Sequence, residues 1–290
     1  MSVRVHHRHT TVQGHRLFYR EAGPQDAPVV VLLHGYPTSS FMFRNLIPLL
    51  ADRNRVIAPD YLGFGHSDAP SAEDFDYTFE ALADLTEALL SDLGVTCYTI
   101  YVQDYGAPVG WRLALRNPDA ITGIITQNGN GYEEGFVPAF WEPVWAYHRA
   151  QTPETAKGIS EALSLDAIKW QYLHGVPDES LVDPNTWLHD HTQISRPGND
   201  KIQLKLFLDY ATNPPLYPEL HNLLRTKDIP VLAVWGRNDE IFGPEGAKAF
   251  TRDQPNTELH LLDGGHFLLE THLHEVAAII TGFLEKQGLR

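Results

Sequence analysis

The chain has 290 residues, 43% hydrophobic and 20% charged, which fits one large globular α/β domain or a core domain with an inserted subdomain. This composition excludes disordered, collagen-like and coiled-coil chains. Twenty-two basic and 37 acidic side chains give a net charge of −15, which argues against nucleic acid and anionic membranes as partners. A single cysteine, Cys97, excludes an internal disulfide and a cysteine-based zinc cluster.

The N-terminal segment, residues 1–10, is polar and rich in histidine, so it lacks the apolar centre of a signal peptide. No apolar run approaches the 18 residues or so that a membrane span needs. These observations predict a cytoplasmic protein without a membrane segment.

Short apolar runs with β-branched residues recur along the chain, and such runs are typical of strands buried on both faces. They cover residues 28–33, 55–58, 98–102, 121–126, 230–235 and, more weakly, 257–262. Helical patterns lie between them at 79–93 and 108–116 and follow them at 274–284. The alternation predicts an α/β fold with a mostly parallel, doubly wound sheet.

The strand patterns stop after the fourth run and resume only at residue 230. The intervening residues are rich in aromatics, proline and helical patterns. We therefore expect a core domain of residues 1–131 and 228–290 with a helical cap of residues 132–227. The cap would cover the carboxyl ends of the strands, where open α/β sheets bind ligands.

Four segments carry candidate chemistry. Asp104 stands between a buried strand and a helix, where a sharp turn exposes a nucleophile; alternatively, it only caps that helix. The backbone N–H groups of Tyr36, in His-Gly-Tyr-Pro after the first buried strand, and of Tyr105 would form an anion hole. His266, in a Gly-Gly-His loop, would be the base, and Asp239, at another strand end, would orient it. The simpler readings are an ordinary loop histidine and a turn aspartate.

Together, HGYP, QDYG, GRND and GGH resemble the α/β-hydrolase superfamily in sequence and in order. The resemblance covers nearly the whole chain, including the place of the cap. An aspartate at the nucleophile position is similar to epoxide hydrolases and haloalkane dehalogenases. Such a carboxylate attacks an sp³ carbon, and water activated by His266 then hydrolyses the alkyl ester. The resemblance implies a small apolar substrate and water, with no metal and no organic cofactor.

The two groups differ in their leaving group. Epoxide hydrolases use cap tyrosines to protonate the alkoxide, and we expect Tyr147 and Tyr210 in this role. Tyr172 is a further candidate for this role. Tyr172 and Trp145 are also candidate substrate contacts. Dehalogenases hold the halide with N–H donors, usually a tryptophan directly after the nucleophile, where this chain has Tyr105.

Other features favour the dehalogenases. Gln103, before the nucleophile, is more typical of them, and the tryptophans of the cap are possible halide donors: Trp141, Trp145, Trp170 and Trp187. Some dehalogenases place the catalytic acid after a different strand, where this chain has Asn128 and Asn130 and no acid. This observation supports Asp239 as the acid but does not decide between the two groups. Because no tryptophan follows Asp104 and tyrosines stand near both ends of the cap, we expect an epoxide hydrolase. A haloalkane dehalogenase is the alternative, and a non-catalytic ligand-binding protein of the same fold is the third hypothesis.

Overall fold

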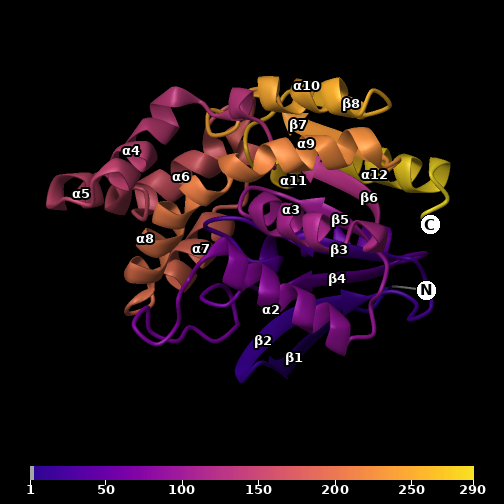
Figure 1. The fold of residues 1–290 in the computed structure, drawn as a ribbon, viewed down its shortest axis with the longest axis horizontal. Helices are drawn as coiled ribbons and strands as arrows, with labels where there is room; N and C mark the ends of the chain where they lie inside the picture. Colours follow the sequence, from indigo (N-terminus) through magenta and orange to yellow (C-terminus); the bar gives the residue numbers. More distant parts are fainter. Residues whose placement is uncertain (1–2) are drawn as a thin grey trace.

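The computed structural model describes residues 3–290, within which eight strands form one sheet in the order β1-β2-β4-β3-β5-β6-β7-β8 (Figure 1). Strands β3 to β8 are parallel, whereas β2 pairs antiparallel with both β1 and β4. The strands are β1 His6–Val12, β2 His15–Ala22, β3 Val29–Leu33, β4 Arg55–Pro59, β5 Tyr98–Val102, β6 Ile121–Gln127, β7 Val231–Gly236 and β8 Glu258–Leu262. Met1 and Ser2, part of the expected core and of the polar N-terminal segment, lie outside the described residues.

The six apolar runs of the sequence are strands β3 to β8, and the predicted α/β-hydrolase fold is confirmed. Strands β1 and β2 were not predicted. On β1 only Val12 is buried, so the strand shows no apolar run. It is held in the sheet by backbone hydrogen bonds to β2, and its exposed histidines and arginine suit an edge strand, which natural sheets commonly line with charged groups.

Three of the α-helices described in the core lie at the predicted patterns, residues 79–93, 108–116 and 274–284, and the other three were not predicted. Outside residues 132–227 the α-helices are α1 Ile47–Leu50, α2 Phe79–Asp92, α3 Gly106–Arg116, α10 Pro244–Asp253, α11 Leu268–Thr271 and α12 Leu273–Lys286. Helices α2 and α3 pack against each other, and α3 also packs on β3 and β5. The helix that follows β5 is therefore fixed directly against the centre of the sheet.

Between β6 and β7 the chain forms helices and no named strand in the described structure. These are α4 Pro138–Arg149, α5 Pro153–Glu161, α6 Leu165–Leu173, α7 Asn185–Ile194, α8 Asn199–Asp209 and α9 Tyr217–Thr226. Helices α4 to α8 lie together at one end of the molecule, far from the C-terminus, whereas α9 packs along α3 and α10 (Figure 1). That residues 132–227 form a separate cap stays a prediction, and the name cap denotes these residues from here on.

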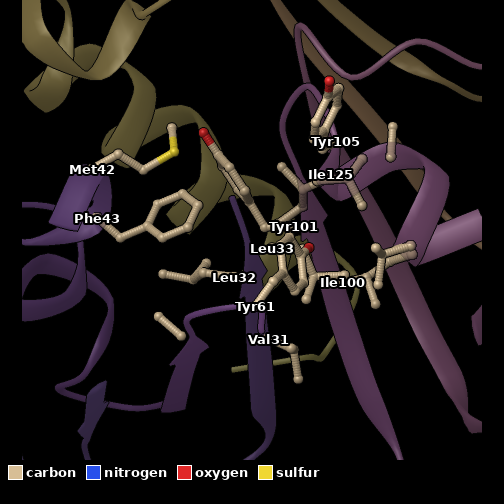
Figure 2. Packing of buried hydrophobic residues seen from close by; sticks show 14 of the residues in the cluster. Val31, Leu32, Leu33, Met42, Phe43, Tyr61, Ile100, Tyr101, Tyr105 and Ile125 are labelled. Atoms are coloured by element: carbon tan, nitrogen blue, oxygen red, sulfur yellow. The ribbon is translucent and has the colours of Figure 1, made fainter. Parts of the chain in front are cut away.

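The centre of the core consists of fully buried side chains from the parallel strands. Figure 2 shows Val31 and Leu33 of β3 beside Ile100 and Tyr101 of β5 and Ile125 of β6. Burial on both faces explains why these strands read as continuous apolar runs. Because close-packed interiors deform little, the carboxyl ends of these strands are held at fixed positions.

Among residues 3–290, no helix combines the length and apolar character that crossing a membrane requires. The same residues contain no group of three or more histidine, cysteine, aspartate or glutamate side chains that is arranged to hold a metal ion.

Candidate active site

Asp104 occupies a sharp turn between β5 and α3. Its φ is +48°, a left-handed conformation that is uncommon for residues other than glycine and that clusters at functional sites. Two glycines leave room for the turn, Gly106 two residues further on and Gly35 in the loop after β3. A Cβ atom on Gly106 would lie 2.0 Å from the Leu33 carbonyl oxygen, and one on Gly35 would lie 2.2 Å from the Asp104 Cβ. The local sequence therefore permits the strained turn that aims the carboxylate out of the sheet.

Backbone amides surround the Asp104 carboxylate. Tyr36 N–H donates to Oδ1 at 2.6 Å, and the neighbouring Tyr105 N–H also favours the charged form of the carboxylate. Only 5% of Asp104 is exposed. Burial raises its pKa to about 6, although His266 and the two amides favour the charged form. The two donors expected from the sequence thus both point at the carboxylate.

His266 is buried between two carboxylates. Its Nδ1 lies 2.8 Å from Asp239 Oδ2, and its Nε2 lies 3.9 Å from Asp104 Oδ2. Burial alone would lower the pKa of His266, but the ion pair and hydrogen bond with Asp239 and the charge of Asp104 together raise it. The three predicted residues come together from the ends of β5, β7 and β8, in the geometry of a nucleophile, an orienting acid and a base.

Two amide side chains that the sequence reasoning did not assign also support this group. Gln103 Nε2 lies 2.8 Å from His266 Nε2. Asn128 Nδ2 donates to Asp239 Oδ2 at 2.7 Å, while Ile241 N–H donates to the other oxygen at 2.7 Å. Their position directly after β5 and β6 was the available signal, because side chains at the carboxyl ends of neighbouring strands converge.

The cap contributes Tyr210, the first residue of the short 3₁₀ helix η5 Tyr210–Thr212. Its ring lies 5.9 Å from the Tyr105 ring and 4.4 Å from the Trp141 ring, measured between centroids. Tyr210 is fully buried, and its hydroxyl has no hydrogen-bond partner within the described part of the chain. Burial, the neighbouring Tyr217 phenol and the charge of Asp104 raise the pKa of Tyr210 well above its ordinary value.

The other cap residues predicted for the site are placed differently. Tyr147 is half-buried on α4, and no contact recorded among residues 3–290 joins it to Asp104, so its role stays a prediction without structural support. Trp145 packs against Trp141 and lies 6.4 Å from Tyr210. Tyr172 donates to Asp190 at 2.5 Å. It therefore already uses its hydroxyl.

Of the four tryptophans that could bind a halide, Trp141 has its indole N–H in a hydrogen bond, and Trp170 and Trp187 make contacts through their ring faces. Trp141, the nearest to Tyr210, donates its indole N–H to the Ile241 carbonyl oxygen at 2.8 Å. Trp170 is 37% exposed and stacks on His174, and Trp187 lies over the Lys169 ammonium. Of these side chains, only Trp145 packs beside Tyr210 without a recorded partner for its N–H in the described residues.

The geometry agrees with comparisons to known proteins. The family described as alpha/beta hydrolase fold matches residues 28–273. This chain belongs to the α/β-hydrolase family. It is 44% identical over 283 residues to Uncharacterized hydrolase YNR064C of Saccharomyces cerevisiae, covering 96% of this chain and 97% of that protein. It is 29% identical over 307 residues to a haloalkane dehalogenase of Bradyrhizobium diazoefficiens, covering 97% and 95%.

A solved structure of the epoxide hydrolase CorEH superimposes on this α/β-hydrolase with a TM-score of 0.77, covering 98% of this chain and 99% of that one. At 22% identity this similarity shows the fold alone. The chain is thus a hydrolase of this family that is similar in sequence to a haloalkane dehalogenase and shares its fold with a solved epoxide hydrolase.

Proposed function

We propose that this α/β-hydrolase converts epoxides to vicinal diols through a covalent ester on Asp104. The observation that carries the proposal is the buried hydroxyl of Tyr210, which has no hydrogen-bond partner among residues 3–290. An epoxide oxygen leaves as a basic alkoxide and needs a proton, and a buried phenol whose O–H is bound by no other residue among 3–290 can donate one. Tyr210 lies close enough to Asp104 for the carboxylate charge to raise that pKa.

In the first step, an Asp104 carboxylate oxygen attacks an epoxide carbon, the carbon–oxygen bond of the ring breaks, and Tyr210 transfers its proton to the leaving oxygen. The product is a hydroxyalkyl ester and a Tyr210 phenolate. Attack needs the ionised form of Asp104. With a pKa of about 6, this carboxylate is both ionised near neutral pH and more basic than an ordinary aspartate.

In the second step, His266 takes a proton from a water molecule, which attacks the ester carbonyl carbon. The N–H groups of Tyr36 and Tyr105, already aimed at this carboxylate, stabilise the oxyanion. Collapse expels the diol oxygen, which takes the proton from His266. The proton of the new Asp104 carboxylic acid then returns to the Tyr210 phenolate, which restores the enzyme.

Esterification of Asp104 also prepares the base. The ester is neutral, so one of the two carboxylates that raise the pKa of His266 loses its charge when the intermediate forms. His266 is then more often neutral, which is the form that accepts a proton, while Asp239 continues to hold its Nδ1.

The second candidate is a haloalkane dehalogenase, which the similarity to the Bradyrhizobium protein favours. Against it, the residue after Asp104 is tyrosine, and the Trp141 N–H is already bound to Ile241. A halide would then depend on Trp145 or on phenol donors.

Product analysis separates the candidates. The purified protein is incubated with terminal and aryl epoxides and, separately, with bromoalkanes of matched carbon number. Diol formation is assayed by gas chromatography and bromide release by ion chromatography. We expect diol with little or no bromide. Bromide from several substrates without diol would establish the dehalogenase reaction, and neither product would favour a ligand-binding protein.

A further inference from the structure

We propose that Arg112 and Asp209 are positioning residues that hold the Tyr210 hydroxyl over Asp104. The proposal rests on the function proposed above, because it takes Tyr210 as the proton donor. Tyr210 lies in the short connection after α8, so the cap helices alone do not fix it. Side chains and amides of the core bind this connection on both sides of Tyr210.

The first anchor is Arg112 of α3, which is 5% exposed. Its guanidinium donates to Asn213 Oδ1 at 2.7 Å and to Thr212 Oγ1 at 2.9 Å. The same group donates to the Pro108 carbonyl oxygen at 3.0 Å and pairs with Glu80 at 3.0 Å, which fixes it on the core. Charge-assisted hydrogen bonds of this kind are strong and directional, so residues 212–213 are held at a set place on α3.

The second anchor is Asp209, directly before Tyr210. Its Oδ2 accepts a hydrogen bond of 2.7 Å from the backbone N–H of Phe79, the first residue of α2. The free N–H groups and dipole at a helix N-terminus favour such a carboxylate. The Phe79 ring then meets the Tyr210 ring edge-on at 5.5 Å and the Tyr105 ring edge-on at 5.0 Å. Phe79 therefore packs against the Tyr210 ring from the core, while Trp141 packs against it at 4.4 Å.

The two anchors connect the proton donor to the nucleophile through a single rigid element. Helix α3 begins at Gly106, two residues after Asp104, and carries Arg112 less than two turns further on. A surface cleft of about 530 Å³ borders Asp209 and Thr212, so water reaches the outer side of the connection. Because solvent lies on that side of the connection, the hydrogen bonds of residues 209, 212 and 213 to α2 and α3 hold the connection, and with it the phenol of Tyr210, in place.

The test is a double-mutant cycle on ring opening. Thr212→Val removes an acceptor of Arg112 with little change of shape, and Asp209→Ala removes the second anchor. Each is made in the wild-type protein and in Tyr210→Phe. A control for the loss of a threonine hydroxyl is Thr86→Val; Thr86 is buried and donates to the Leu82 carbonyl oxygen within α2, whereas Thr212 is exposed. The rate of ester formation is measured in single turnovers with excess enzyme and an aryl epoxide, by rapid quench and mass spectrometry of the Asp104 peptide.

We expect Thr212→Val and Asp209→Ala each to slow ester formation about 10- to 100-fold, part of the 10²- to 10⁴-fold that a general acid supplies. In Tyr210→Phe the same changes should alter the rate less than twofold, because no proton donor remains to be misplaced. Thr86→Val should change neither background by more than twofold.

Equal losses in both backgrounds would show that the two residues only stabilise the fold, and the positioning proposal would be wrong while the proposed function stands. If the wild-type protein formed no diol, or if Tyr210→Phe opened epoxides at the wild-type rate, the proton-donor role would fail and the positioning proposal with it.

Discussion

The core and the cap bring their groups to the site by different means. In the core, Asp104 is aimed by a backbone turn with φ of +48°, and the amides that bind it belong to neighbouring segments of the same sheet edge. On the cap side, Tyr210 is held beside Tyr105 by side-chain contacts that its neighbours in sequence make. Arg112, for example, donates to Thr212 and Asn213, about 100 positions further along the chain. Backbone geometry therefore fixes the proposed nucleophile, whereas long-range side-chain contacts fix the proposed proton donor.

This difference predicts how the two regions respond to substitution. Changes to the core groups should stop a chemical step completely, because nothing else can replace a nucleophile or its base. Changes on the cap side should reduce the rate of ring opening by different amounts and leave the rate of ester hydrolysis unchanged. The experiments below can break or sharpen that contrast, beginning with the largest expected effect.

His266→Gln should reduce diol turnover at least about 10³-fold, because ester hydrolysis needs a base. Ring opening needs none, so the hydroxyalkyl ester should accumulate. Mass spectrometry of the peptide containing Asp104 should show an adduct of the substrate mass. His274→Gln, the same change on an exposed position of α12, is the control and should turn over normally. An inactive His266→Gln protein without any adduct would contradict this division of labour.

Tyr210→Phe should slow ring opening about 10²- to 10³-fold, since a donor aimed at developing charge typically contributes about 3 to 4 kcal/mol. Tyr147→Phe makes the same change on half-exposed α4 and, lacking a recorded contact with the site, should alter the rate less than twofold. The measurement is the single-turnover rate of ester formation, with circular dichroism to confirm folding. The opposite order of effects would restore Tyr147 as the principal donor.

Ring opening should lose rate in acid. Burial raises the pKa of Asp104 to about 6, and only the carboxylate attacks, so the rate should be constant above that pH and fall about tenfold for each pH unit below it. Tyr210→Phe should lower the constant rate at high pH without changing the pH at which the rate begins to fall, because that fall comes from protonation of Asp104. A pH profile of single-turnover rates, recorded where the protein stays folded, checks both statements. A flat profile down to pH 4 would contradict them.

The smallest effect is on stability and lies in the cap. Burial raises the pKa of Asp190 on α7 to about 7, although hydrogen bonds from Tyr172 and Thr38 favour its charged form; Glu270 raises it further, and Arg44 lowers it. Because the pKa is 3.8 in the unfolded chain, the folded state prefers the neutral acid, and stability is lost as pH rises from about 4 to 7.

Asp190→Asn removes this penalty, which is at most about 4 kcal/mol. Urea unfolding should therefore show a larger gain in the free energy of unfolding at pH 8 than at pH 5. Asp26→Asn, on an exposed turn, is the control and should show no pH-dependent difference. A gain that is equal at both pH values would mean that Asp190 is not the titrating group.

The core was predictable from the sequence because its signals are local. Asp104 and Asp239 each follow a buried strand that forms an apolar run, and His266 follows the half-buried strand β8, so their meeting at one edge of the sheet could be expected. Their catalytic roles stay predictions. Strand β1 could not be predicted from an apolar run, because backbone pairing with β2 rather than burial of apolar side chains holds it in the sheet.

The cap was less predictable because helical spacing does not tell which face of a helix meets the site. Tyr147 and Tyr210 looked alike in sequence, yet only Tyr210 is buried beside Tyr105. What separates them is a set of contacts to Phe79 and Arg112 from distant parts of the chain. No local pattern encodes such contacts.

The covalent route through Asp104 is tested most directly by a single turnover in water enriched in ¹⁸O, with the protein in excess over an epoxide substrate. The water oxygen enters the ester carbonyl carbon and stays on the carboxylate, whereas the diol carries away the oxygen that Asp104 used to attack. We predict ¹⁸O in the peptide that contains Asp104 and none in the first diol. Label in the first diol, with an unlabelled peptide, would mean that water attacks the epoxide directly and would contradict the mechanism.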